Sequence, residues 1–135
     1  MDRRMMLQGA GGKSDMNGWT DGVAYTDLTV VKNSYVKASN GAFTAYSGWD
    51  RTSYVPCDGC SSITFPPCPQ GAGTPDSNRF YDANKVVVGG NTDNFSLSKT
   101  VSTTITVPAT AAYFAISSEA AALASCINAG IVPHA

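Results

Sequence analysis

The amino-acid sequence predicts an all-β protein: a jelly-roll-like antiparallel β-sandwich with an extended N-terminal arm and one short C-terminal helix. Three observations support this fold class. Short segments with alternating or β-branched residues recur along the chain, Gly, Pro and Asn interrupt them at close intervals, and a helix-forming pattern is confined to the C-terminal region. The 135 residues suit a single domain, and a hydrophobic content of 43% suffices for one modest core.

The chain begins with a Gly-, Ser- and Asp-rich stretch, residues 1–18, which has no hydrophobic periodicity. We interpret this stretch as a flexible arm. A sharper interpretation is an anchor that becomes ordered against a neighbouring subunit. The residues suited to such anchoring are Arg3, Arg4, Met5, Met6 and Leu7, together with Trp19 at the junction with the domain, where it is an interface or packing residue.

The first half of the domain contains four predicted strand regions. Val23–Val31 is rich in β-branched residues, and residues 33–46 form two short strands about a tight turn at Asn40–Gly41. The polar segment YSGWDRTS is predicted to be a loop, and the short strand after it ends at Pro56. The next strand, SSITF, stops at a pair of prolines.

The second half continues with strands and closes with the helix. The segment NRFYDANKVVVGG predicts a strand, a turn at residues 82–85 and a second strand, and TTITVP and AAYFAIS are the last strands. The helix over SSEAAALASCINAG has Ser117 or Ser118 as its N-cap and ends at Gly130. The predicted organisation is therefore an arm (1–18), a sandwich domain (19–117) and a short helix with a C-terminal tail (118–135).

Four motifs follow one another in this order: SYVKASNGAFT, YVPCDGCSSITF, RFYDANKVVV and TTITVPATAAYFAIS. Their order and residues resemble the small jelly-roll β-sandwich domain of bacteriophage tail, baseplate and head-fibre proteins of gut phages and prophages. The resemblance covers roughly residues 34–117. It implies a non-enzymatic virion protein, assembled in the host cytoplasm, that decorates a capsid or forms part of a tail, fibre or baseplate. Its partners would be other virion proteins, to which the N-terminal arm would attach it.

Charge and hydropathy exclude two classes of partner. Charged residues make up 14% of the chain and the net charge is -1, so there is no basic surplus to neutralise the phosphates of a nucleic acid. The longest apolar run, Ala111–Ile116, is too short to insert across a membrane. A small sandwich with low charge has exposed strand edges to cover, so we expect a homo-oligomer, with a trimer as one form.

The four cysteines admit three interpretations. Cys57, Cys60 and Cys68 lie close together in the sequence, and Cys57 stands where the phage domain pattern has a valine. We favour thiols in a structural role, because a protein made in a cytoplasm keeps its cysteines reduced. A disulfide formed late is the second interpretation. A zinc site on these three cysteines is the third, since a fourth ligand is not evident beyond the distant Cys126 or His134. No cofactor is expected.

Aromatic residues suggest an alternative function, a carbohydrate-binding module that recognises host surface glycans. The candidate residues are Trp49, Asp50, Arg51, Tyr46 and Tyr81, because an exposed ring stacks on a sugar while polar neighbours bind its hydroxyls. For Trp49 itself we favour a structural role, in which it covers the open end of the sandwich.

A third possibility, a polysaccharide depolymerase, is less favoured. A glycoside hydrolase needs two acids that face one pocket. The chain has a single glutamate, Glu119, and its aspartates mostly occupy turns such as those at Asp58, Asp76, Asp82 and Asp93. The single histidine, His134, lies one residue from the C-terminus and is expected in an exposed tail. We therefore expect no catalytic residues and no enzymatic activity.

Overall fold

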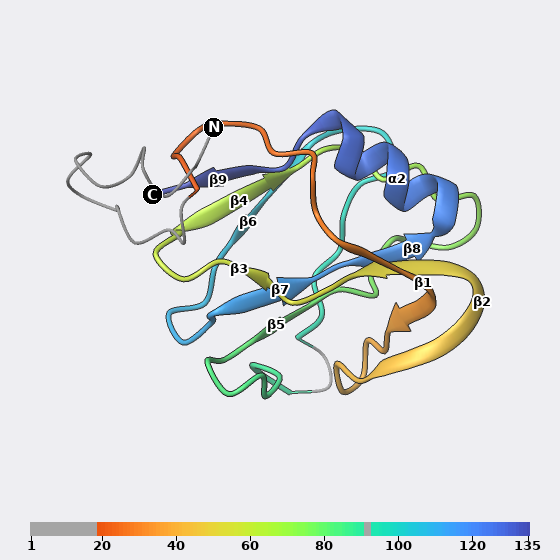
Figure 1. Cartoon of the computed structure of the whole chain (residues 1–135), viewed down its shortest axis with the longest axis horizontal. Helices are drawn as coiled ribbons and strands as arrows, with labels where there is room; N and C mark the ends of the chain where they lie inside the picture. Colours follow the sequence, from red (N-terminus) through yellow and green to blue (C-terminus); the bar gives the residue numbers. More distant parts are fainter. Residues whose placement is uncertain (1–18, 91–92) are drawn as a thin grey trace.

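A computed structural model of the chain describes residues 19–90 and 93–135. Antiparallel strands dominate these residues and form three sheets of three strands each, with one helix packed beside them (Figure 1). The predicted class, an all-β sandwich-like fold with one short C-terminal helix, is confirmed. The predicted N-terminal arm lies outside the described residues.

The strand orders in the three sheets are β1-β2-β8, β3-β7-β5 and β6-β4-β9. In chain order the elements are β1 (Val30–Val36), β2 (Phe43–Thr52), β3 (Val55–Pro56), β4 (Ser62–Phe65), β5 (Arg79–Tyr81), β6 (Thr103–Thr106), β7 (Tyr113–Ala115), β8 (Ser117–Glu119), α2 (Ala120–Ala129) and β9 (Val132–His134).

A long hairpin, β1–β2, forms most of the first sheet. The predicted turn is confirmed: Gly41 has a φ of 71°, and its N–H donates to the carbonyl of Lys37 at 2.7 Å. The strand predicted over Val23–Val31 is wrong, because β1 begins only at Val30. Before that point the chain makes a single bridge, from Tyr25. The β-branched residues there fit a pleated surface, but propensity alone does not supply a neighbouring strand.

The segment YSGWDRTS is not the predicted loop. Its residues 46–52 belong to β2, which pairs with β1 on one side and with β8 on the other. Its glycine and serines are typical of loops, but Asp50 and Arg51 are paired with a neighbouring strand on both sides. Tertiary pairing therefore overrides the local turn signal.

One extended run of chain links two of the sheets. β7 lies between β3 and β5, and β8 follows it after Ile116 to pair with β2. At the crossing, the N–H of Thr52 donates to the carbonyl of Ile116 at 2.9 Å, and the N–H of Ile116 donates to the Thr52 hydroxyl at 3.1 Å. Backbone polar groups thus stay bonded where the chain changes sheet.

The helix α2 begins later than predicted. Ser117 and Ser118 lie in β8, and Glu119 occupies the N-cap position without a side-chain capping bond. Both serine hydroxyls are buried and bond elsewhere: Ser117 donates to the Ser77 carbonyl at 2.6 Å, and Ser118 donates to the Gln70 side chain at 2.8 Å. The predicted end at Gly130, with a φ of 101°, is confirmed.

The C-terminal residues form a strand rather than an exposed tail. β9 pairs with β4, and Ile131 exchanges two backbone hydrogen bonds with Tyr25, each of 2.9 Å. His134 is therefore half-buried and in a sheet, contrary to the expected exposed position. The free side of β4 offers ladder hydrogen bonds that a three-residue strand can satisfy, whatever its proximity to the chain end.

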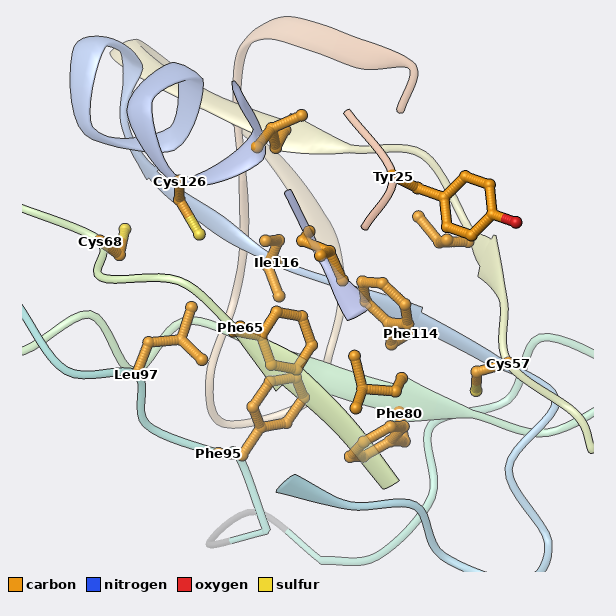
Figure 2. Close-up of a cluster of buried hydrophobic side chains, with 14 of the residues drawn as sticks. Tyr25, Cys57, Phe65, Cys68, Phe80, Phe95, Leu97, Phe114, Ile116 and Cys126 are labelled. Carbon is orange, nitrogen blue, oxygen red and sulfur yellow. The ribbon is translucent and has the colours of Figure 1, made fainter. Parts of the chain in front are cut away.

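The main hydrophobic core lies between α2 and the strands and is rich in phenylalanine (Figure 2). Phe65 packs edge-on against Phe114 with ring centroids 5.3 Å apart, and Phe80 packs against Phe95 at 4.8 Å. Such aromatic pairs contribute roughly 0.5–1.5 kcal/mol each beyond the area they bury. Leu123 and Ile127 of α2 close the cluster from the helix side.

A second cluster unites all four motifs of the sequence. We call it the motif cluster; it consists of Val36, Tyr81 and Ala115, with Phe43, Tyr54, Val87 and Tyr113 packed against it. Val36 and Phe43 come from the first motif and Tyr54 from the second. Tyr81 and Val87 come from the third motif, and Tyr113 and Ala115 from the fourth.

Candidate functional site

A bulge in β2 presents aromatic side chains midway along the β1–β2 hairpin. The register between the strands shifts at Asn33, so that residues 46–49 of β2 lie opposite this one residue. Asn33 has a φ of 56°, and its side-chain oxygen accepts the N–H of Gly48 at 3.3 Å. A bulge re-aims the side chains on the strand that contains it. Here it separates the bulge residues from the regular alternation of β2.

Three rings meet at this bulge: Tyr35 of β1 and Tyr46 and Trp49 of β2, which we call the hairpin aromatic cluster. Ring centroids are 5.4 Å apart for Tyr35 and Tyr46, 5.9 Å for Tyr35 and Trp49, and 6.0 Å for Tyr46 and Trp49. The two pairs that include Trp49 are edge-on, so the rings support one another and do not form a flat platform. Tyr46 is 55% exposed and is the ring most open to solvent.

Asp50 is buried and holds the same hairpin together. Its side chain is 4% exposed, and its carboxylate accepts the Lys32 ammonium at 2.9 Å and the N–H of Asn33 at 3.1 Å. These two bonds cross from β2 to β1 beside the bulge. The carboxylate therefore fixes the backbone that carries Trp49, and a ligand would have to displace Lys32 to reach it.

Arg51 follows Asp50 in β2, and its side chain is bound by other residues of the same hairpin. Its guanidinium carbon is 3.7 Å from the centre of the Phe43 ring, and Nε donates to the Ser34 hydroxyl at 2.8 Å. Desolvation by burial lowers the pKa of this group. Arg51 thus packs on Phe43 of the motif cluster.

Tyr81 and Trp19 are both core residues. Tyr81 is 2% exposed, and its hydroxyl donates to the Gly41 carbonyl at 2.7 Å. Burial raises the pKa of that phenol. Trp19 is 6% exposed and packs against Tyr25, with ring centroids 4.6 Å apart. The other residues assigned to the anchor, Arg3, Arg4, Met5, Met6 and Leu7, lie outside the described residues.

The four cysteines divide into two pairs. Cys57 is buried and Cys60 half-buried, on the turn before β4, where the N–H of Cys60 donates to the Cys57 carbonyl at 3.1 Å. Desolvation by burial raises the pKa of Cys57. Cys68 and Cys126 are both 0% exposed, and each thiol shifts the pKa of the other, which is lowered for Cys68 and raised for Cys126. Cys68 therefore pairs with the helix and not with the two cysteines that precede it.

Within residues 19–90 and 93–135, no group of three or more His, Cys, Asp or Glu side chains is arranged to hold a metal ion. The proposed zinc set of Cys57, Cys60 and Cys68 therefore has no cluster to support it among the described residues. The described part of the chain also contains no helix long and apolar enough to cross a membrane.

His134 forms part of a row of hydroxyls across the third sheet. Its Nε2 is 2.8 Å from the Thr64 hydroxyl, which lies 2.8 Å from the Thr104 hydroxyl. A hydroxyl beside an imidazole resembles a nucleophile with its base. Here the hydroxyl lies on a sheet surface beside a second threonine, and its contacts are cross-strand hydrogen bonds of the kind that stabilise sheets.

A cavity of about 410 Å³ lies beside β5 and β6. Its lining is mixed: apolar side chains come from Phe80, Val88, Phe95, Ile105 and Pro108, and polar ones from Asp93, Asn94 and Thr106. The Asp93 carboxylate accepts the N–H of Gly90 at 2.9 Å, which is the turn role predicted for it. The predicted role of Asp82 is also confirmed, since it accepts N–H groups of its own turn.

Comparison of the chain with protein-family models, with curated proteins and with solved structures finds no match. The functional argument therefore depends on the residues and geometry of this chain.

Of the five glycan candidates named from the sequence, two lie in the hairpin aromatic cluster, namely Tyr46 and Trp49. The sequence interpretation did not name Tyr35, which completes the cluster, or Asn33, which lies opposite the bulge. Tyr35 lies on the neighbouring strand, so its contact with Tyr46 depends on strand register. One sequence signal was available: an isolated glycine within a strand pattern indicates a bulge, and Gly48 occupies this one.

Proposed function

We propose that this chain is a structural component of a bacteriophage particle: a sandwich domain that displays a surface, attached to a larger assembly by residues 1–18. The proposal extends the resemblance of its four motifs to the sandwich domain of phage tail, baseplate and head-fibre proteins. Its role is capsid decoration or part of a tail, fibre or baseplate, and it is not enzymatic.

The observation that supports this proposal is the motif cluster. Four short motifs, each weak alone, meet in one packed group of side chains. Three of them also supply one sheet, in which β7 of the fourth motif lies between β3 of the second and β5 of the third. Motifs that pack on one another are parts of one structural unit. We interpret their order as that of the phage sandwich domain.

The outer edges of the sheets suit assembly into a homo-oligomer, with a trimer as one form. β1 and β6 are end strands in their sheets, and no further strand covers their outer edges in the described chain. Unpaired N–H and C=O groups at such edges are commonly covered by another subunit. The mass of the purified chain in solution, measured by light scattering, tests this part of the proposal.

The decisive experiment compares incorporation of the full chain with incorporation of a chain that lacks residues 1–18. Purified particles of the phage or prophage that encodes the chain should contain the full chain at a fixed stoichiometry. The shortened chain should fold, as judged by its circular dichroism, and should fail to incorporate. The cut must leave Trp19 in place, because this side chain is part of the main core.

Two results would refute the proposal. If purified particles do not contain the chain, the assignment to the virion is wrong. If the chain that lacks residues 1–18 is incorporated as fully as the complete one, these residues are not the anchor.

The hairpin aromatic cluster supports a second function, binding of a host surface glycan. Tyr46 presents an exposed ring, Tyr35 and Trp49 hold it in place, and Lys32 supplies an ammonium that is 76% exposed on the adjoining strand. A ring with polar neighbours can stack on the apolar face of a sugar while hydroxyls are bound beside it. Multiple copies on one particle would strengthen a weak single contact.

Titration with oligosaccharides from the host surface tests this second function through tryptophan fluorescence. Binding should quench the emission of Trp49, and Tyr46→Ala should weaken the affinity at least tenfold. Val86→Ala is the matched control, because Val86 is 58% exposed and lies outside the hairpin. Unchanged affinity in Tyr46→Ala would contradict a site at the hairpin.

A further inference from the structure

The two cysteines farthest from solvent form a pair that the proposed function does not use. Cys68 lies on the segment after β4, and Cys126 lies on α2. Both residues are 0% exposed, both belong to the main core, and their thiols interact closely enough to shift each other's pKa. Figure 2 shows the two sulfurs on the same side of the phenylalanine cluster, beneath the helix.

The surroundings of the pair give the two sulfurs different roles. The Cys126 thiol also lies 3.6 Å from the Pro66 carbonyl, to which it can donate. The interaction of the two neighbouring thiols lowers the pKa of Cys68 and raises the pKa of Cys126. Cys68 is therefore the better nucleophile, and Cys126 holds its proton.

We propose that Cys68 and Cys126 are a site of oxidative modification, at which a peroxide converts the two thiols into an intramolecular disulfide between the β4 segment and α2. This inference goes beyond the proposed function and does not depend on it. Hydrogen peroxide is the appropriate oxidant, because it is hardly larger than water and the two thiols have no exposed surface.

The chemistry proceeds in two steps. The Cys68 sulfur attacks one oxygen of the peroxide, the O–O bond breaks, and the departing hydroxide takes up a proton to leave as water, which gives a sulfenic acid at Cys68. The Cys126 sulfur then attacks the Cys68 sulfur, the S–O bond breaks, and the hydroxide leaves with the Cys126 proton as a second water. Two thiols lose two electrons in total, and one peroxide is reduced to two waters.

The disulfide would stabilise the fold by constraining the unfolded chain. It closes a loop of roughly 60 residues, and loops of this length lose substantial entropy when they are cross-linked. The Tm should therefore rise by roughly 10 °C. The cross-link would fasten α2 to the β4 segment when the protein enters oxidising surroundings.

The test treats the reduced full-length chain with hydrogen peroxide, blocks the remaining thiols by alkylation under denaturing conditions and maps the peptides by mass spectrometry. The number of alkylated cysteines should fall from 4 to two, with one cross-linked peptide pair that contains Cys68 and Cys126. Cys126→Ser should instead accumulate a sulfenic acid at Cys68 that dimedone traps. Cys57→Ser is the matched control, because Cys57 is also buried, and it should form the same cross-link as the wild type.

Three results would overturn the proposal: four thiols that survive treatment, a cross-link between Cys57 and Cys60 instead, or equal thiol loss in Cys68→Ser and wild type. If the serine variants do not fold, the peptide map of the wild-type chain decides the question alone.

Discussion

At the scale of single residues, buried polar side chains connect segments that are far apart in the sequence. Arg79 is 0% exposed, and its guanidinium donates to the carbonyls of Ala38 at 2.6 Å, Val88 at 3.2 Å and Gly90 at 2.7 Å. Bonds from a charged donor are stronger than neutral ones, so one side chain joins the hairpin turn to the end of the third motif. Tyr81 does the same through its bond to Gly41.

Tyr81 leads to a prediction on alkaline stability. Its pKa is raised in the folded chain by burial, so the unfolded chain loses this proton first, from about pH 10 upward. The unfolded state then binds fewer protons than the folded state, and the free energy of unfolding falls with rising pH by up to about 1.4 kcal/mol per pH unit for this group. Below pH 10 the contribution is fully present.

Tyr81→Phe should remove this part of the alkaline slope and should also cost about 1 kcal/mol at pH 7 through the lost bond to Gly41. Urea denaturation at pH values from 7 to about 11 measures both effects. Tyr46→Phe, on a ring that is 55% exposed, is the matched control. An alkaline slope that is equal in Tyr81→Phe and the wild type would contradict the prediction.

At the scale of elements, turns and bulges determine which faces of the strands meet. The β1–β2 turn brings Gly41 against the motif cluster: a Cβ placed there would lie 2.8 Å from a Val87 methyl and 3.2 Å from the Tyr81 ring. The bulge opposite Asn33 has the converse effect and directs aromatic residues away from the core. The helix ends at Gly130, where the chain turns back into β9.

Gly41→Ala should lower the free energy of unfolding by about 2–4 kcal/mol, because positive φ and a steric clash act together. Gly22→Ala separates the two effects: Gly22 has a φ of 77°, but no atom lies within 4 Å of its added Cβ. This control should cost only about 1–2 kcal/mol. Chemical denaturation of both variants measures the difference. Equal losses would show that the contact with Val87 relaxes without cost.

At the scale of the whole molecule, the two ends of the described chain close on each other. The N–H of Gly22 donates to the Pro133 carbonyl at 2.8 Å, the N–H of Ala135 donates to the Asp21 carboxylate at 2.8 Å, and Ile131 pairs with Tyr25. Sheet β6-β4-β9 is completed only by these last residues. The last strand therefore contributes to the stability of the entire domain.

Deletion of residues 131–135 should destabilise the domain by more than about 3 kcal/mol, because it removes the fully buried Ile131 and one strand of a three-stranded sheet. Deletion of Ala135 alone should cost less than about 1 kcal/mol, since it leaves β9 and Ile131 intact. Thermal unfolding followed by circular dichroism compares the two. A Tm for the longer deletion that matches the wild type would mean that β9 does not support the fold.

The sequence by itself determined the all-β class, the Asn40–Gly41 turn, the strand SSITF, the end of the helix at Gly130 and the turn roles of Asp82 and Asp93. Each depends on local chemistry, namely side-chain alternation, positive φ or a carboxylate acceptor two to four residues from its donor. Only the tertiary structure decided that YSGWDRTS is a strand, that Val132–His134 completes a sheet and that Cys68 pairs with Cys126. These features need a partner from a distant part of the chain, and local sequence does not reveal which segments will meet.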